Sequence, residues 1–289
     1  VMTITTALNN SNRVFFTDSN CLQFTRRVFY EKLPLQGNVY PVTCAAYIEG
    51  ERYRVTLLSA QSLGFLAGER AGQMNIWLDR RLGQDDNRGL QEPVLDNVPT
   101  RSVFRIVVEA LSSEPASVPP GSGELPLPGL TREAHWLLND LIYPVSQFAL
   151  SPAVEPTLIG HLKSNLVFMR PGGLPPDFEL VALKTFFSAS ERFTSDMHSA
   201  PGSQLGILLH RTLPYCGRTY LCEQCNVTPA SVPDQVAVSE LFPQLALQRA
   251  LRTSLTFIPT KTAQTDGQTP TPYLTVQPME LEAFLLLPA

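Results

Sequence analysis

The chain has 289 residues, of which 44% are apolar and 17% are charged, and its formal net charge is −4. This length allows one large domain or two smaller ones, each with a real core. The acidic balance excludes nucleic acid as the main partner, because phosphate binding needs a concentrated basic face. No apolar run reaches the length of a membrane span, so no membrane contact is expected from this segment.

The first third of the chain is expected to form antiparallel β-structure. Aromatic and β-branched residues alternate with polar ones through residues 13–30, and a turn at Gly50 separates two further strand patterns. Residues 72–82 and 101–111 show two more strand patterns. These short segments, broken by turns, favour a sheet-based core over long helices.

The rest of the chain contains one predicted helix among strands. Residues 111–130 are rich in Pro, Ser and Gly and read as a linker or extended loop. A helix is predicted from an N-cap at Thr131 until Pro144 stops it. Strands resume in the stretches "FELVALKTFF", "QLGILLHRTL", "TSLTFIPT" and "TVQPMELEAFLLL".

The complete pattern predicts a mainly β fold. We expect a large antiparallel β-sandwich with one short helix and long loops. It divides into a first β-sandwich part at 1–110, a linker or loop at 111–130, and a helix with a second β-sandwich part at 131–289.

The stretch "LDRRLGQDDNRGL" at 78–90 concentrates charge between two predicted strands. Asp85 and Asp86 are adjacent, and neighbours on an extended backbone point to opposite sides, which disfavours a pair of glycosidase carboxylates. Arg88 places a cation among the oxygen ligands that a calcium loop would need. From the residues alone, the favoured interpretation is a solvated loop whose ion pairs contribute about 0–1 kcal/mol each.

Three of the five cysteines, Cys216, Cys222 and Cys225, lie close together. The Cys-x-x-Cys pair is typical of zinc or redox sites, but no second pair or histidine motif completes a zinc site. A local disulfide from Cys216 to Cys222 or Cys225 is favoured if the chain is secretory. Asn9 and Asn226 match the glycosylation sequon and are candidate glycan sites.

Other residues that could carry chemistry are interpreted as structural. Trp77 and Trp136 are expected in the core, and His210 is expected to be a structural histidine on an apolar strand. No Ser-His-Asp, Cys-His or phosphate-cradling Gly-rich motif stands out in the sequence.

The order of four motifs resembles one enzyme family. The stretches "FFTDSNCLQFTRR", "KLPLQGNVYPVTCAAYIEG", "RVTLLSAQSLG" and "LDRRLGQDDNRGL" resemble the glycoside hydrolase family 38 α-mannosidases, most closely the Golgi α-mannosidase II type. The ending "QPMELEAFLLL" is similar to the final strand of that family. The resemblance is dense over 13–110 and thins through 111–270. Cys21 stands where the family usually has Gly.

The resemblance implies that the chain is the C-terminal β-region of such an enzyme, with a supersandwich similar to galactose mutarotase-type domains. In the family, the zinc ligands, the nucleophilic Asp and the acid/base Asp belong mainly to an N-terminal α/β domain, which a helical bundle follows. This chain would therefore lack the nucleophile and the zinc site, and would be inactive alone. The implied enzyme hydrolyses terminal α-mannosides of N-glycans with retention in the Golgi lumen, or alternatively in the lysosome.

The resemblance also implies a role for the loop at 79–89, which would reach the active-site pocket. Arg88 would contact the bound mannose or its ordered waters, and Asp85 and Asp86 would hold Arg88, since a buried charge needs partners. Gly89 would allow close approach of the backbone. The alternative is a non-catalytic carbohydrate-binding or scaffold β-sandwich module that uses the same loop.

Overall fold

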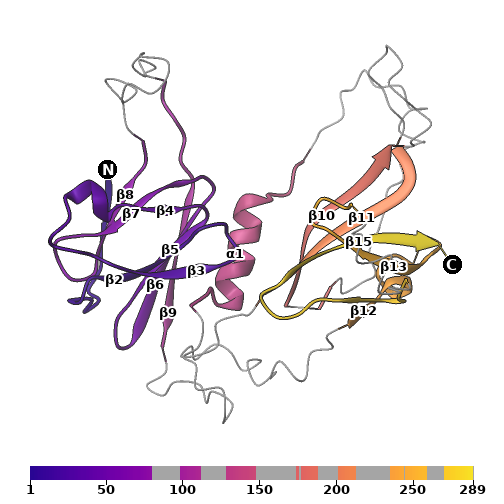
Figure 1. Ribbon diagram of the computed structural model, residues 1–289. Coiled ribbons are helices and arrows are strands. Elements are labelled where there is room, and N and C mark those ends of the chain that lie inside the picture. The colour runs from indigo at the N-terminus through magenta and orange to yellow at the C-terminus, as the bar shows by residue number, and fades with distance from the viewer. Residues whose placement is uncertain are drawn as a thin grey trace, which may run out of the picture. The chain divides into compact units, whose positions relative to one another are not determined.

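The computed structural model describes residues 1–79, 98–111, 128–147, 174–175, 177–187, 201–212, 235–243, 245–258 and 270–288. These residues belong to two compact units (Figure 1). The first unit comprises Val1–Gln147 and Pro214–Asn226, and the second comprises Phe148–Leu213 and Val227–Ala289.

Two antiparallel sheets build the first unit. One sheet has the order β1-β8-β7-β4 and the other has the order β3-β2-β5-β6-β9. The strands are β1 (Met2–Thr5), β2 (Val14–Asp18), β3 (Phe24–Val28), β4 (Tyr40–Val42), β5 (Ala45–Glu49), β6 (Tyr53–Ser59), β7 (Leu63–Ala67), β8 (Gln73–Trp77) and β9 (Phe104–Ala110), with a 3-10 helix at Leu35–Asn38 before β4.

The main core of the first unit lies between these two sheets. Phe15, Ile48 and Leu57 come from one sheet and pack in a buried cluster with Phe65 and Ile76 of the other. The hairpin predicted around Gly50 is present, because β5 and β6 pair with Ala45 opposite Leu58 and Glu49 opposite Arg54. The predicted antiparallel β-sandwich is confirmed.

A helix covers the second face of the five-stranded sheet. Helix α1 (Arg132–Ile142) turns Ala134, Leu138 and Leu141 toward the sheet, where they join the buried ring of Tyr47. Both faces of β5 are therefore covered, which explains why its residues are apolar without alternation. The helix was predicted to belong with the second β-sandwich part at 131–289, but α1 packs on β6 and β9 of the first unit.

The predicted N-cap of α1 is present and is tied to a buried ionic cluster. The Thr131 hydroxyl accepts a hydrogen bond from the Ala134 backbone N–H at 3.2 Å and donates one to the Glu109 carboxylate. Glu109 lies opposite Arg54 in the sheet. The fully buried Arg54 binds the Glu49 carboxylate and the Gly129 carbonyl. The cluster fixes the start of α1 against β6 and β9.

Glu109 gives the stability of the first unit a defined pH dependence. Burial raises the pKa of its carboxyl above the ordinary 4.5, while the Thr131 hydroxyl and the Arg54 charge lower it less. The folded chain thus binds more protons than the unfolded chain just above pH 4.5. The stabilisation is complete below that pH and is lost as the pH rises through the raised pKa.

We therefore expect Glu109→Gln to flatten the dependence of the unfolding free energy on pH above 4.5. Urea denaturation of the wild type and the variant over a pH series measures this directly. Glu69→Gln, at an exposed acid, is the matched control and should follow the wild-type curve. Parallel curves for the wild type and Glu109→Gln would show that Glu109 does not titrate differently in the folded state.

The second unit has a four-stranded antiparallel sheet with the order β10-β11-β15-β13 and a separate pair of strands, β12 and β14. Leu209, Leu274 and Phe284 contribute to its buried core. Its elements are β10 (Phe178–Phe187), β11 (Pro201–Arg211), β12 (Gln235–Ala237), the short helix α3 (Val238–Leu241), β13 (Leu247–Thr253), β14 (Tyr273–Thr275) and β15 (Leu281–Pro288).

One predicted strand of the second unit is wrong. The stretch 253–260 was expected to be a strand, but β13 ends at Thr253 and a turn follows it. The Phe257 N–H donates to the Ser254 carbonyl, and Phe257 has a φ of 61°. This left-handed conformation is incompatible with a strand.

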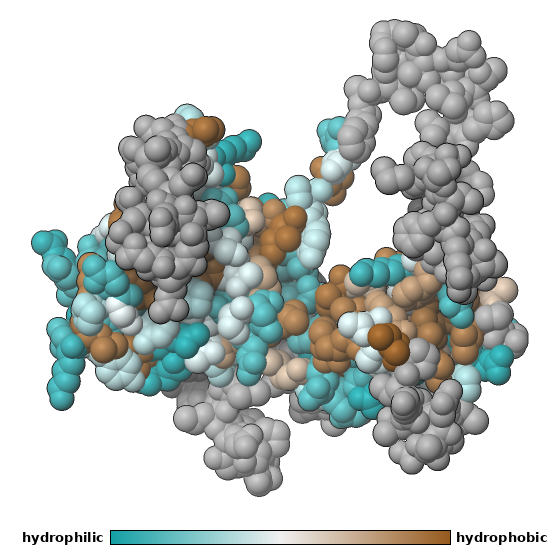
Figure 2. Space-filling model, turned by 45° about the horizontal axis from the view of Figure 1, so that its top comes forward, coloured by the Kyte–Doolittle hydropathy of each residue, from teal (hydrophilic) through white to brown (hydrophobic). Residues whose placement is uncertain are grey.

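Apolar side chains also gather on the surface of the second unit, seen on the right of Figure 2. Val181, Leu183, Leu255 and Ile258 are exposed. Within the described ranges, no helix combines the length and the apolar character that crossing a bilayer requires.

Candidate functional site

The described residues on either side of 80–97 are held by neighbouring parts of the β6–β7 segment of the first unit. Trp77, the last residue of β8, pairs with Gly64 at the start of β7. On the other side, the Ala60 N–H donates to the Val103 carbonyl at 3.1 Å, and the Gln61 side-chain amide donates to the Ser102 hydroxyl at 2.7 Å. The start of β7 therefore holds the residues before 80–97, and the adjoining β6–β7 turn at 60–62 holds Ser102 and Val103 after them. We call this arrangement the loop rim.

The two sides of the loop rim come from different sheets. Strand β8 belongs to the four-stranded sheet and β9 to the five-stranded sheet. Leu78 packs on the core between the sheets, and Asp79 follows it. The described residues before and after 80–97 therefore lead into different sheets of the sandwich.

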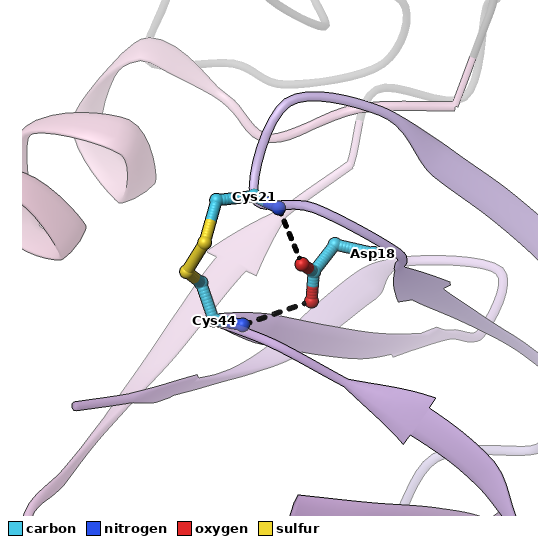
Figure 3. A group of neighbouring side chains, drawn as sticks. All are labelled: Asp18, Cys21 and Cys44. Carbon is cyan, nitrogen blue, oxygen red and sulfur yellow. Dashed lines mark hydrogen bonds between the residues drawn. A yellow bond between two sulfur atoms is a disulfide. The ribbon is translucent and has the colours of Figure 1, made fainter. Parts of the chain in front are cut away.

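A buried carboxylate organises the same end of the sandwich. Asp18, at the end of β2, is fully buried. One of its oxygens, Oδ1, accepts backbone N–H bonds from Thr43, Cys44 and Ala45, each at 3.0 Å, and Oδ2 accepts one from Cys21 at 2.6 Å. A disulfide joins Cys21 to Cys44 beside these bonds (Figure 3). We call this group the Asp18 clamp.

The Asp18 clamp is connected to the loop rim through one hydrogen bond. The Ser59 N–H, at the end of β6, donates to the Cys44 carbonyl at 2.7 Å. The Ser59 hydroxyl in turn donates to the Gln61 carbonyl at 2.6 Å and shapes the turn that anchors the loop. The clamp therefore fixes the backbone on which the loop rim is built.

The disulfide holds Cys21 in an unusual backbone conformation. Cys21 has a φ of 64°, a left-handed conformation that a residue with a Cβ adopts at a cost of about 1–2 kcal/mol. Glycine, the residue that the resemblance leads one to expect here, would adopt this conformation freely. In this chain the covalent bond to Cys44 and the bond from the Cys21 N–H to Asp18 offset that cost.

The Asp18 clamp does not fit a metal ion, although its ligand-type atoms lie within 4.8 Å of one another. Zinc binds thiolates, whereas both sulfurs here are joined in a disulfide. Both carboxylate oxygens already accept backbone N–H groups. The chemistry of this donor set is structural, and no zinc-dependent step is derived from it.

Comparison with known proteins assigns this chain to a family. Residues 1–88 match the model described as "Glycosyl hydrolases family 38 C-terminal domain". A relative from Mus musculus named Alpha-mannosidase 2 is 33% identical over 287 residues, which is 98% of this chain and 23% of the relative. The chain belongs to the C-terminal region of glycosyl hydrolase family 38.

Two further relatives show a similar level of identity over shorter stretches. The Alpha-mannosidase 2 of Homo sapiens is 36% identical over 210 residues, covering 73% of this chain and 17% of that protein. The Alpha-mannosidase 2 of Drosophila melanogaster is 33% identical over 252 residues, covering 86% and 20%. The chain therefore spans about a fifth of the length of these relatives.

Most of the site residues that the sequence predicted lie outside the described residues of this family 38 chain. This holds for the four loop residues and for the four C-terminal candidates, which are Asp85, Asp86, Arg88, Gly89, Cys216, Cys222, Cys225 and Asn226. Asn9 is described, and its side chain is exposed, as a glycan acceptor requires. The Cys21–Cys44 disulfide was not predicted, because its two cysteines are 23 residues apart in the sequence, whereas the other three cysteines are clustered.

Proposed function

We propose that this chain is the C-terminal β-portion of a zinc-dependent α-mannosidase that hydrolyses terminal α-mannosides of N-glycans with retention. The named relatives support the class of enzyme, since all three are called Alpha-mannosidase 2. The family match through residue 88 carries the proposal, because it extends across the loop at 79–89 as far as Arg88.

The fold supports a role for the loop in the active-site wall. The loop rim fixes both flanks of residues 80–97 with backbone pairing and side-chain hydrogen bonds. An arginine that meets a sugar needs a rigid base, since a displacement of about 1 Å can cost about a hundredfold in rate. The Asp18 clamp supplies rigidity through four backbone hydrogen bonds and one disulfide.

Each loop residue has a distinct role in the proposal. Arg88 donates to the hydroxyls or ordered waters of the bound mannose. Asp85 and Asp86 pair with Arg88, because a guanidinium that leaves water needs a carboxylate nearby. Gly89 lets the backbone approach the sugar without a Cβ.

The reacting carboxylates belong to another part of the enzyme in this proposal. A retaining glycosidase needs two carboxyls about 5–5.5 Å apart, and Asp85 and Asp86, as adjacent residues, are poorly placed for that geometry. A zinc ion would supply Lewis-acid contacts to the sugar hydroxyls, with its ligands outside this chain. The chain's expected partners are thus the α/β domain and helical bundle of the same polypeptide and the glycan substrate.

The disulfide supports a secretory location. Disulfides persist in oxidising compartments, and Cys21 and Cys44 are joined in the first unit. We propose the Golgi lumen, with the lysosome as the alternative. The exposed side chain of Asn9, in its sequon, agrees with passage through the secretory pathway.

The purified chain 1–289 should show no turnover of an aryl α-mannoside, with or without added zinc. The reason is that the nucleophile and the acid/base group are expected outside it. The measurement is release of the aryl group, and the full-length polypeptide serves as the positive control. Zinc-dependent turnover by the chain alone would contradict the proposed division of labour.

A further inference from the structure

We propose that a cleft in the second unit binds one neutral sugar ring of a glycan. The cleft has a volume of about 270 Å³ and lies among β13, β14 and β15. The choice of a glycan as ligand rests on the proposed function. The existence of the cleft does not depend on the proposed function, because it follows from the side chains that line it.

The first wall of the cleft is the outward face of β14 and the residues that follow it. Leu274 and Val276 are buried in the core of the second unit. The alternate residues, Tyr273, Thr275 and Gln277, are exposed and line the cleft. This period of two is that of an extended chain with one face on the core, so the polar and aromatic groups share one surface.

A second part of the lining is an ion pair between neighbouring strands. The Arg252 guanidinium of β13 forms two hydrogen bonds with the Glu282 carboxylate of β15, and the bond from Nε measures 2.6 Å. The two contacts fix the planes of both groups. The Arg252 side chain remains 57% exposed, so its outer edge can meet a ligand in the cleft.

The chemistry of these walls matches a neutral sugar ring. A guanidinium has five N–H donors, more than the two contacts with Glu282 use, and a carboxylate has further lone pairs. Sugar hydroxyls both donate and accept hydrogen bonds, so a hydroxyl can accept from the Arg252 guanidinium or donate to the Glu282 carboxylate. Tyr273 is 45% exposed and offers an aromatic face to the apolar C–H face of the ring.

Charge and size narrow the class of ligand further. Because Arg252 and Glu282 neutralise each other, the cleft does not select a phosphate or a carboxylate. The volume of about 270 Å³ lies just below the range of about 300–1,000 Å³ that is typical for drug-sized ligands. One pyranose ring at the end of a glycan branch suits this volume.

The test is an NMR titration of the full chain 1–289 with methyl α-mannoside, with N-acetylglucosamine and with a high-mannose oligosaccharide. We expect saturable binding of at least one of them, with a Kd on the order of 1 mM. Tyr273→Ala should weaken binding at least tenfold, and Glu282→Gln, which keeps the side-chain volume, should also weaken it. Tyr53→Ala removes an equally exposed tyrosine from the first unit and should leave binding unchanged.

Arg88→Ala separates this cleft from the loop at 79–89 and should not change the titration. Absence of binding by all three sugars, or unchanged binding in a cooperatively folded Tyr273→Ala chain, would overturn the proposal. Loss of binding in Arg88→Ala alone would overturn it too, because the sugar would then lie at the loop. Failure of the proposed function would instead be seen in turnover by the full-length enzyme, which this titration does not measure.

Discussion

Replacing Arg88 by alanine is expected to lower kcat/KM of the full-length enzyme for an α-mannoside by about ten- to one-hundredfold. This loss corresponds to about 1.4–2.8 kcal/mol of transition-state stabilisation. The physical reason is that a charged donor, held near the sugar by two carboxylates, would be removed from the wall of the pocket. Steady-state kinetics of purified wild type and variant measure the change.

Two controls accompany Arg88→Ala. Arg88→Lys keeps the charge but loses the planar fork of donors, so its activity should fall between wild type and Arg88→Ala. Arg101→Ala removes an exposed arginine that follows the loop in the sequence, and it should leave kcat/KM unchanged. Wild-type kinetics in Arg88→Ala would reduce the loop at 79–89 to a surface turn.

Removal of the Asp18 carboxylate should give the largest loss of stability in the first unit. Asp18→Ala leaves four backbone N–H groups without their acceptor in a buried site. Each buried unsatisfied group costs about 1–3 kcal/mol, so we expect the unfolding free energy to fall by about 3 kcal/mol or more. Urea denaturation at neutral pH measures it.

Asp18→Asn tests the geometry of the Asp18 clamp more finely. Its amide oxygen can still accept from Thr43, Cys44 and Ala45, but its NH₂ group would face the Cys21 N–H. The loss should therefore be smaller than for Asp18→Ala. Asp140→Ala, at a 61% exposed ion pair, should cost no more than about 1 kcal/mol. Equal unfolding free energies of Asp18→Ala and Asp140→Ala would contradict a stabilising role for the Asp18 clamp.

Local patterns predicted the elements that have one buried face. Residues 72–82 alternate, and the structure buries Met74 and Ile76 of β8 as the alternation requires. Thr131 was predicted as an N-cap and caps α1. These signals are local, since a cap or an alternation depends on neighbours along the chain.

Predictions failed where the outcome depends on contacts distant in sequence. Trp136 was expected in the core, but it is 55% exposed. The helix turns Ala134, Leu138 and Leu141 inward. Trp136 therefore lies on the outer face, where the Arg132 guanidinium sits 4.8 Å from its ring. Packing against the sheet determines which face of the helix is buried, and the sequence of the helix alone does not reveal that face.

The Asp18 clamp shows the same limit. Asp18 and Cys21 lie in a turn after one strand, and Cys44 lies 23 residues beyond Cys21. Nothing in the local pattern pairs these cysteines in preference to the three crowded ones. The signal that could have found the pair is Cys21, which stands where the family resemblance predicts glycine.

The role of the loop at 79–89 could be predicted only from the family resemblance. Its charges alone favoured a solvated turn, because adjacent aspartates are poorly placed to act as paired glycosidase carboxylates. The structure adds the loop rim, which holds the flanks of the loop at one end of the sandwich. It does not describe Arg88 itself, so the contact with the sugar stays a prediction.

A crystal structure of the full-length enzyme with a mannose-like inhibitor tests that contact most directly. We predict a hydrogen bond of about 2.7–3.2 Å from Arg88, or from a water that it holds, to the inhibitor. The nucleophilic carboxylate in the same structure should come from outside residues 1–289. An inhibitor that is bound with residues 79–89 turned away from it would contradict the account.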